Sequence, residues 1–278
     1  MKRACVIGWP VKHSRSPLIH GYWLQLYGID GSYGVQPVEP SGAEAFVRGL
    51  PASGLAGCNV TLPHKQVAYA VAEIKDRSAV AVGAANTLWL EGGKIAAANT
   101  DTAGFMRHLE TAHPQWRRRD GPVAVLGAGG AARAIVFGLL EAGVGQIRVF
   151  NRTTDRAEDL ARHFGPRVRV CDWSDRAAGS TDCALVVNTT SLGMQNAGPL
   201  DIDLSRHNRE CVVADIVYVP LETPLLRQAR MLGMPTLDGL GMLLHQAVPG
   251  FEKWFGVRPE VTPELRAALV ADIEGEKC

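Results

Sequence analysis

The chain has 278 residues, of which 46% are hydrophobic and 21% charged, and its formal net charge is +1 at pH 7. This composition is typical of a globular protein large enough for two domains. The balanced charge gives no basis for binding nucleic acid or a membrane surface. Six cysteines occur without C-x-x-C or zinc-ligand spacing, which predicts reduced thiols and no metal site. With no signal peptide and no apolar run long enough to span a bilayer, a cytoplasmic enzyme is expected.

Strand and helix signals alternate through the first hundred residues, which predicts an α/β sheet. The segments with strand character are a first one ending at Gly8, then 33–38, 57–61, and a hairpin over 88–96 that turns at Gly92-Gly93.

Two helices are expected between these strands. The first begins with Ser16 as its N-cap, has a proline in its first turn and extends through Tyr27. The second extends to Leu50, and its Ser41 and Glu44 have the spacing of a capping box.

A glycine-rich turn, Gly127-Ala128-Gly129-Gly130-Ala131, separates a short apolar run from an apolar helical stretch. The order strand, glycine turn, helix is the context in which this motif binds a dinucleotide. Gly127 permits the turn, and Gly129 lets backbone N–H groups approach a pyrophosphate at the helix N-terminus. Gly130 or Ala131 is expected to let the helix pack closely on the strand. Since about 120 residues precede this turn, the substrate is expected to bind upstream of it.

The next strand ends in Asn151-Arg152-Thr153. An acid at this point usually binds the ribose 2′-hydroxyl of NAD, but here Arg152 follows the strand, and Arg156 comes four residues later. Guanidinium groups pair with a 2′-phosphate in a forked geometry, which favours NADP(H). The alternative is that both arginines are solvated residues at a helix start.

The rest of the chain continues the alternation. Strands are expected at 147–150, 167–170, 184–188, 211–216 and 235–237, with helices between them, which predicts a doubly wound domain. A long helix over 240–255 and a last one capped by Thr262 follow without further strands. Both are expected to pack on the N-terminal domain.

Four polar clusters lie at expected strand ends or loops: His13-Ser14-Arg15-Ser16-Pro17, Asn59-Val60-Thr61-Leu62-Pro63-His64-Lys65, Asn86-Thr87 and Asn99-Thr100-Asp101. Hydroxyls of Ser14 and Ser16 at a helix start suit a carboxylate, whereas simple N-capping by Ser16 would leave Ser14 unexplained. Any single Asn-Thr pair is adequately explained by turn formation. Together the clusters favour a site for a polyhydroxylated anion, in which Lys65 and Asp101 exchange a proton with an oxygen.

These motifs resemble those of the shikimate dehydrogenase family over nearly the full length. The motifs that carry the resemblance are Gly8 through Pro17, Asn59 through Lys65, Ala84-Ala85-Asn86-Thr87, Asn99-Thr100-Asp101, the glycine turn, Asn151-Arg152-Thr153 and Asp238-Gly239-Leu240-Gly241-Met242-Leu243-Leu244-His245-Gln246.

The resemblance implies roles for individual residues. Lys65 and Asp101 would be the catalytic pair, and Ser14 and Ser16 would bind the substrate carboxylate. The other expected substrate contacts are Thr61, Asn86, Tyr218 and Gln246. The expected NADP(H) contacts are Gly127, Ala128, Gly129, Gly130, Ala131, Asn151, Arg152, Thr153, Arg156, Thr189, Ile216, Gly239 and Met242.

The implied architecture is α/β with two domains. Residues 1–103 and 240–278 would form a discontinuous substrate domain completed by C-terminal helices, and 104–239 a Rossmann domain for NADP(H). The expected activity is NADPH-dependent reversible reduction of 3-dehydroshikimate to shikimate, in aromatic amino-acid and chorismate biosynthesis. The alternatives are a quinate/shikimate dehydrogenase with broader substrate or NAD use, or a non-catalytic relative that binds a metabolite. A monomer or homodimer without nucleic-acid, membrane or metal partners is expected.

Overall fold

A computed structural model describes residues 1–195 and 197–275 of the chain. Its two compact units are Met1–Gly104 with Leu244–Glu274, and Phe105–Leu243 with Gly275. Each contains a six-stranded sheet with helices, which confirms the α/β class. The end of the expected substrate domain, 276–278, lies outside the described residues. Among those described, none of the helices has the length and apolar character needed to cross a lipid bilayer.

The sheet of the first unit is mixed, with the order β2-β1-β3-β5-β6-β4. Its strands are β1 (Lys2–Gly8), β2 (Gly31–Pro37), β3 (Gly57–Val60), β4 (Ile74–Lys75), β5 (Thr87–Glu91) and β6 (Lys94–Ala98). Strands β1, β2 and β3 are parallel, while β5 is antiparallel to both β3 and β6. The expected hairpin is therefore confirmed as β5 and β6.

The helices in or entering this unit are α1 (Ser16–Leu26), α2 (Ala43–Arg48), α3 (Lys65–Val71), α4 (Arg77–Val82), α5 (Thr100–Ala112), α9 (Gly239–Phe255) and α10 (Pro263–Gly275), with 3-10 turns η1 (Pro40–Gly42) and η2 (Leu50–Ala52). The unit boundaries fall inside α5 and α9. Helices α3 and α4 and the short strand β4 were not anticipated from the sequence.

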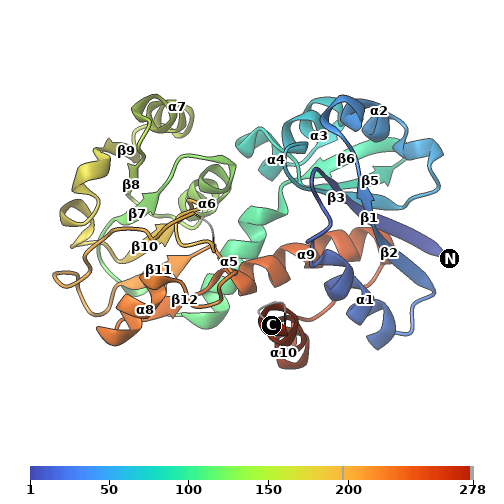
Figure 1. The fold of residues 1–278 in the computed structure, drawn as a ribbon. Coiled ribbons are helices and arrows are strands. Elements are labelled where there is room, and N and C mark those ends of the chain that lie inside the picture. Colours follow the sequence, from blue (N-terminus) through green and yellow to red (C-terminus); the bar gives the residue numbers. More distant parts are fainter. Residues whose placement is uncertain (196, 276–278) are drawn as a thin grey trace. The chain divides into compact units, whose positions relative to one another are not determined.

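Helices cover both faces of the first sheet (Figure 1). On one face, Ile7, Val60 and Leu88 pack with Val47 of α2 and Ala68 of α3. The other face carries α1 and α9 with a cluster of aromatic rings. The rings of this cluster are His20, Trp23, Tyr33, Phe251 and Trp254.

Indole hydrogen bonds attach the C-terminal segment to the first unit. Trp254 Nε1 donates to the carbonyl of Leu88 at 2.8 Å, and Trp23 Nε1 donates to the carbonyl of Glu260 at 2.9 Å. Helix α10 begins with Thr262 as an acceptor, since its Oγ1 receives the N–H of Leu265 at 3.3 Å, which confirms the expected cap.

Two expected caps are wrong. Ser16 is the first residue of α1 rather than its N-cap, and its N–H donates to Oγ of Ser14 at 3.3 Å. The expected second helix divides into η1 and α2, and α2 has no side-chain cap. Glu44 accepts from Nε of Arg48 at 2.9 Å instead of closing a capping box, because an i, i+4 partner is available on the exposed face.

The second unit has an all-parallel sheet with the order β12-β11-β10-β7-β8-β9. Its strands are β7 (Val123–Leu126), β8 (Ile147–Phe150), β9 (Val168–Cys171), β10 (Leu185–Asn188), β11 (Val212–Asp215) and β12 (Thr236–Leu237). Its further helices are α6 (Gly130–Glu141), α7 (Thr154–Phe164) and α8 (Pro224–Met231), with 3-10 turns η3 (Trp116–Arg118), η4 (Trp173–Asp175) and η5 (Ala178–Ser180). The five expected strands in 147–237 are confirmed within about one residue at each end.

Alternate residues of these strands enter two cores on opposite faces. Val123, Val125 and Val149 pack with α6 and α7, whereas Ala124 and Leu126 pack on the α8 side. Burial on both faces explains the continuous apolar runs in the sequence. Because both faces of the sheet are apolar, polar functional side chains are expected at the ends of the strands.

Gly57 offers a test of the close packing between β3, β5 and α9. A Cβ atom at Gly57 would lie 2.1 Å from the carbonyl oxygen of Leu88 and 2.2 Å from Nε1 of Trp254, whereas Gly34 in β2 has open space. We expect Gly57→Ala to lower the free energy of unfolding by about 3 kcal/mol or more, measured by urea denaturation. Gly34→Ala is the matched control, with an effect within about 0.5 kcal/mol. Equal effects of the two substitutions would contradict this packing.

Candidate active site

Lys65 and Asp101 are brought together in the first unit. Lys65 is the first residue of α3, just after the turn that follows β3, and Asp101 lies in the first turn of α5, just after β6. The Lys65 ammonium donates to Oδ2 of Asp101 at 2.6 Å, and the two side chains are 27% and 14% exposed. The pair is thus a short charge-assisted hydrogen bond that solvent still reaches.

Asn86 holds the other oxygen of this carboxylate. Its Nδ2 donates to Oδ1 of Asp101 at 2.8 Å. Its own Oδ1 accepts from the backbone N–H of Thr100 at 2.7 Å and from the Thr100 hydroxyl at 3.1 Å. Because a backbone N–H can only donate, the amide orientation of Asn86 is determined by Thr100. Both Asp101 oxygens therefore have hydrogen-bond donors in fixed positions.

A buried hydrogen-bonded chain continues behind Asn86. Thr87 Oγ1 lies 3.2 Å from Oδ1 of Asn86 and accepts from Nδ2 of Asn59 at 3.2 Å. The Tyr33 hydroxyl donates to Oδ1 of Asn59 at 2.7 Å. His20 stacks on Tyr33 with ring centroids 4.1 Å apart, and burial lowers the pKa of His20 to about 3, so its ring is neutral.

Sequence reasoning missed Tyr33 and His20 as parts of this network. Neither belongs to a polar cluster, and Tyr33 is 26 residues from Asn59 in the chain. The parallel pairing of β2, β1 and β3 brings Tyr33 close to Asn59. Only the arrangement of the sheet, and no local signal, could have shown this contact.

The remaining expected substrate residues of the first unit lie in two places. The Ser14 hydroxyl donates to that of Ser16 at 3.2 Å, at the beginning of α1. Between them, Nε of Arg15 is 3.0 Å from a carboxylate oxygen of Asp272 in α10, so the serine loop is anchored to the C-terminal helix. Oε1 of Gln246, in α9, lies 3.5 Å from the Thr100 hydroxyl oxygen, which places its amide beside the Asn86 cluster.

Thr61 lies between β3 and α3, with its N–H donating to the carbonyl of Ile7 at 2.9 Å. A Cβ atom at Gly8 would be 2.4 Å from Cγ2 of Thr61, so glycine is required where the ends of β1 and β3 meet. Tyr218, expected to contact the substrate, is a half-buried residue in the loop after β11 of the second unit.

The glycine turn connects β7 to α6 in the second unit. Gly127 has φ of +111°, and a Cβ there would lie 2.5 Å from Oγ1 of Thr189, which itself donates to the carbonyl of Leu126 at 2.7 Å. Gly129 precedes α6 in an extended conformation, and no side chain caps this helix. A Cβ atom at Gly129 or Gly130 would meet no atom within 4 Å. The helix N-terminus is thus open to an anion.

One expectation about this turn is wrong in its detail. Gly130 faces open space and Ala131 is only half-buried, so neither mediates the close packing of α6 on the sheet. Ala132, one residue later, is fully buried in the core shared by α6 and the strands. The helix begins at Gly130, so its inward-facing side begins two positions into the first turn.

Exposed cations follow β8. Asn151 Nδ2 donates to the carbonyl of Thr153 at 2.7 Å, and this bond shapes the turn into α7. Arg152 and Arg156 are exposed, and neither forms an ion pair with another described residue. Two unpaired guanidinium groups beside the glycine-turn strand fit a phosphate better than a neutral hydroxyl.

The other expected cofactor residues lie after the neighbouring strands. Thr189 follows β10, Ile216 follows β11 and Gly239 follows β12. The carbonyl of Ile216 would be 2.2 Å from a Cβ at Gly239, and Met242 packs with Ile216 against the same core. Thr189, Ile216 and Gly239 therefore lie at the carboxyl ends of parallel strands, where α/β sheets bind ligands, and Met242 lies in the first turn of α9 that follows them.

Asp215 was not anticipated, although it ends the apolar run of β11. It is 2% exposed and accepts hydrogen bonds from Asn188 Nδ2 at 3.0 Å, the N–H of Val217 at 3.0 Å and the Thr223 hydroxyl at 2.8 Å. Burial raises its pKa to about 6, although these three donors act in the opposite direction. Asp215 thus connects the loops after β10 and β11.

No group of three or more His, Cys, Asp or Glu side chains within residues 1–195 and 197–275 is arranged to hold a metal ion. The described cysteines, Cys5, Cys58, Cys171, Cys183 and Cys211, are all free, and Cys278 lies outside the described residues.

Comparison with protein families identifies three segments. The model of the shikimate dehydrogenase substrate binding domain matches residues 6–88, and that of shikimate/quinate 5-dehydrogenase matches 110–216. The shikimate 5′-dehydrogenase C-terminal domain matches 239–269. The first match contains Lys65 and Asn86, and the second contains the glycine turn and Arg152.

Individual relatives agree over almost the whole length. Shikimate dehydrogenase (NADP(+)) of Nitrobacter winogradskyi is 55% identical, covering 98% of this chain and 97% of the relative, and that of Brucella canis is 52% identical, covering 98% and 95%. The solved structure of Thermus thermophilus shikimate 5-dehydrogenase with NADP(H) and shikimate has a TM-score of 0.87 at 33% identity, covering 98% of this chain and 100% of that one. Quinate dehydrogenase of Corynebacterium glutamicum with NAD has a TM-score of 0.88 at 29% identity, covering 97% and 99%.

The raised pKa of Asp215 makes a pH-dependent contribution to stability. Because its folded-state pKa of about 6 exceeds the unfolded value of 3.8, the folded state retains the proton more strongly. This stabilisation is complete below about pH 4 and is lost as the pH rises through 6. We expect wild type to lose up to about 3 kcal/mol of unfolding free energy relative to Asp215→Asn between pH 4 and 7, measured by urea denaturation.

The comparison with Asp215→Asn cancels contributions common to both proteins. His20 is the main one, since its lowered pKa makes stability fall as the pH drops below 6.5. A difference between the two proteins that stays constant from pH 4 to 7 would contradict a raised pKa at Asp215.

Proposed function

Because the chain belongs to the shikimate dehydrogenase family, we propose that it catalyses the reversible NADPH-dependent reduction of 3-dehydroshikimate to shikimate. This reaction belongs to the shikimate pathway, which leads to chorismate and the aromatic amino acids. The observation that carries the proposal is the Lys65–Asp101–Asn86 cluster, a solvated proton-transfer pair surrounded by hydroxyl and amide groups. These groups suit a polyhydroxylated substrate.

The residues of the second unit fit NADP(H). The uncapped start of α6 and the open space at Gly129 and Gly130 accommodate a pyrophosphate, and Arg152 and Arg156 offer unpaired charge to a 2′-phosphate. Asn151 and Thr153 would shape that phosphate site, while Thr189, Ile216, Gly239 and Met242 would line the rest of the cofactor. When bound, NADPH supplies the hydride.

Lys65 would handle the proton at the reacting oxygen. Its ammonium has three N–H groups, and one is held by Asp101, so the others are free to donate to a substrate oxygen. In the direction of reduction this oxygen acquires a proton, which Lys65 is placed to provide. Asp101 would hold the ammonium in place and stabilise its charge.

The remaining polar groups would position the substrate. Hydroxyls of Ser14 and Ser16, at the start of α1, suit the carboxylate. Thr61, Asn86 and Gln246 would bind ring hydroxyls, and Tyr218 is assigned to the substrate through the family resemblance. The fixed amide of Asn86 gives this pocket a defined pattern of donors and acceptors.

We further propose a cytoplasmic location and a monomeric or homodimeric state. Five free cysteines among the described residues fit a reducing compartment. Light scattering from the purified chain distinguishes monomer from homodimer.

Replacing Lys65 tests its proton-transfer role. We expect Lys65→Met to lower kcat for shikimate oxidation by about 100-fold or more, because general acid–base catalysis contributes this much. The Kd for NADP⁺, measured by fluorescence titration, is expected to change by less than about twofold. Lys94→Met, on the exposed hairpin, is the control and is expected to leave kcat unchanged. Near-normal turnover in Lys65→Met would exclude this role.

A second test addresses substrate and cofactor. Steady-state oxidation of shikimate and of quinate, each with NADP⁺ and NAD⁺, is expected to be rapid only for shikimate with NADP⁺. Arg152→Ala is expected to raise KM for NADP⁺ by about tenfold or more, with little change for NAD⁺, because a charge-assisted bond to phosphate is lost.

Arg162→Ala is the matched control, since Arg162 is an exposed residue of α7, the helix that follows Arg152, and pairs with Asp159. Comparable rates with quinate or NAD⁺ would favour the broader quinate/shikimate enzyme. Binding of NADP⁺ without activity in all four combinations would favour a non-catalytic relative.

A further inference from the structure

A cavity lies in the second unit, at the amino-terminal edge of its sheet. Its volume is about 600 Å³, and Ala184, Cys211 and Pro235 on its wall immediately precede β10, β11 and β12. All six strands are parallel, so their carboxyl ends, with the glycine turn, lie at the opposite edge. This cavity is therefore separate from the residues assigned to NADP(H), and its size is that of a small-molecule site.

Arginines outnumber acidic residues on the wall of the cavity. Arg118, Arg119 and Arg209 line it, against the two carboxylates of Asp120 and Glu210. Arg209 donates to the backbone carbonyls of Leu204 and Ser205, at 3.4 and 2.9 Å, which orient its guanidinium without neutralising it.

Two thiols also line the cavity. Burial raises the pKa of both Cys183 and Cys211 to about 12, so they are neutral at pH 7 and do not balance the arginines.

Arg119 has a buried donor without an acceptor. Its Nη1 is shielded from solvent and has no hydrogen-bond partner among the residues that the structure describes. The other guanidinium nitrogens of Arg119 also have no hydrogen-bond partner among these residues, but they are not shielded, so an anionic oxygen in the cavity that Arg119 lines would accept from them. Arg118, the adjacent residue on the same wall, likewise forms no ion pair within the described chain.

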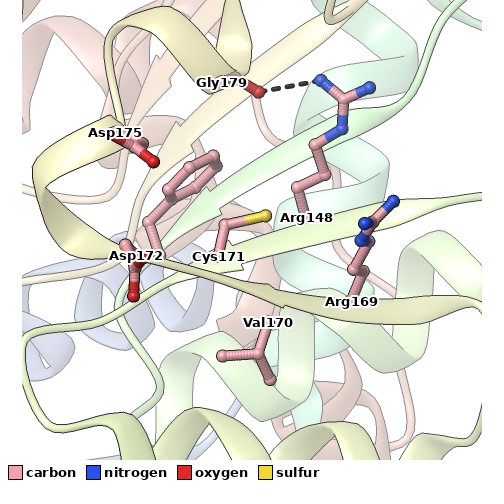
Figure 2. A pocket seen from close by; sticks show the side chains of 8 residues that line it. Arg148, Arg169, Val170, Cys171, Asp172, Asp175 and Gly179 are labelled. Atoms are coloured by element: carbon pink, nitrogen blue, oxygen red, sulfur yellow. Dashed lines mark hydrogen bonds between the residues drawn. The ribbon is translucent and has the colours of Figure 1, made fainter.

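A hollow beside β8 and β9 provides a useful contrast (Figure 2). Its volume is about 370 Å³, and it also contains arginines, but Arg148 donates to the carbonyl of Gly179 at 2.8 Å and to both carboxylate oxygens of Asp182 at 2.6 and 2.9 Å. Asp172 and Asp175 add negative charge. Arg148 is therefore already neutralised, and the two aspartates outnumber the other arginine of that hollow, Arg169, so the hollow has no excess of positive charge for an anion.

We propose that the cavity lined by Arg118, Arg119 and Arg209 binds a small organic anion carrying a phosphate group, with Arg119 as its principal ligand. A phosphate oxygen accepts several N–H bonds at once and matches the planar fork of a guanidinium. This site is additional to the proposed catalytic site and does not depend on the reaction assigned there.

Calorimetric titration of the NADP⁺-saturated protein tests the proposal, because NADP⁺ occupies the other phosphate-binding site. The probes are glycerol 3-phosphate and inorganic phosphate. We expect one equivalent of glycerol 3-phosphate to bind, and its affinity to fall at least tenfold in Arg119→Met. Arg117→Met is the control: Arg117 pairs with Glu110 and stacks on Trp116 but does not line the cavity. Binding to this control is expected to match wild type.

Arg209→Met provides a second variant in case Arg119→Met fails to fold, as judged by NADP⁺ affinity and melting temperature. Equal binding to wild type and to a folded cavity variant would overturn the proposal, as would no saturable binding of either probe to wild type. Preference for inorganic phosphate over the ester would also overturn it, since a cavity of this size would then serve no organic anion. Shikimate oxidation is measured separately, so failure here leaves the proposed catalytic function untouched.

Discussion

The hydrogen bond between Lys65 and Asp101 is the interaction around which the candidate site of the first unit is organised. The two residues are 36 positions apart, and each stands at the start of a helix that follows a strand. A flexible lysine side chain is held at one place only if its partner is itself fixed. Asn86 fixes Asp101, and the N–H of Thr100 fixes Asn86, so the position of the ammonium depends finally on rigid backbone.

Asn86 is itself supported by buried hydrogen-bonding groups behind it. Thr87, Asn59 and Tyr33 form a continuous chain of hydrogen bonds behind Asn86. Such a network needs every member satisfied, because an unpaired polar group in a low-dielectric interior is costly. The aromatic layer of α1 and α9 covers the Tyr33 end of this chain. The C-terminal segment thus contributes to the site both through Gln246 and by burying the network that supports it.

Much of this arrangement could be predicted from the sequence where a local pattern has one physical meaning. The glycine turn between an apolar strand and a helix, the hairpin at Gly92-Gly93 and the parallel strands of the second unit are of this kind. Caps were predicted less well, since Ser16 forms hydrogen bonds with Ser14 and Glu44 pairs with Arg48. Tyr33 and Asp215 could not be found, because their roles arise from contacts between strands distant in the sequence.

Cofactor choice illustrates why a fold alone does not determine function. Quinate dehydrogenase with NAD and shikimate 5-dehydrogenase with NADP(H) resemble this chain almost equally, at TM-scores of 0.88 and 0.87. The discrimination must therefore come from a few side chains presented by a common framework. In this chain Arg152 follows β8 and Arg156 lies in the first turn of α7, neither of them with a paired acid, and Asn151 Nδ2 donates to the carbonyl of Thr153 in the turn between these elements. A dinucleotide without the 2′-phosphate would leave these two guanidinium groups without an anionic partner, whereas the 2′-phosphate of NADP(H) would supply one.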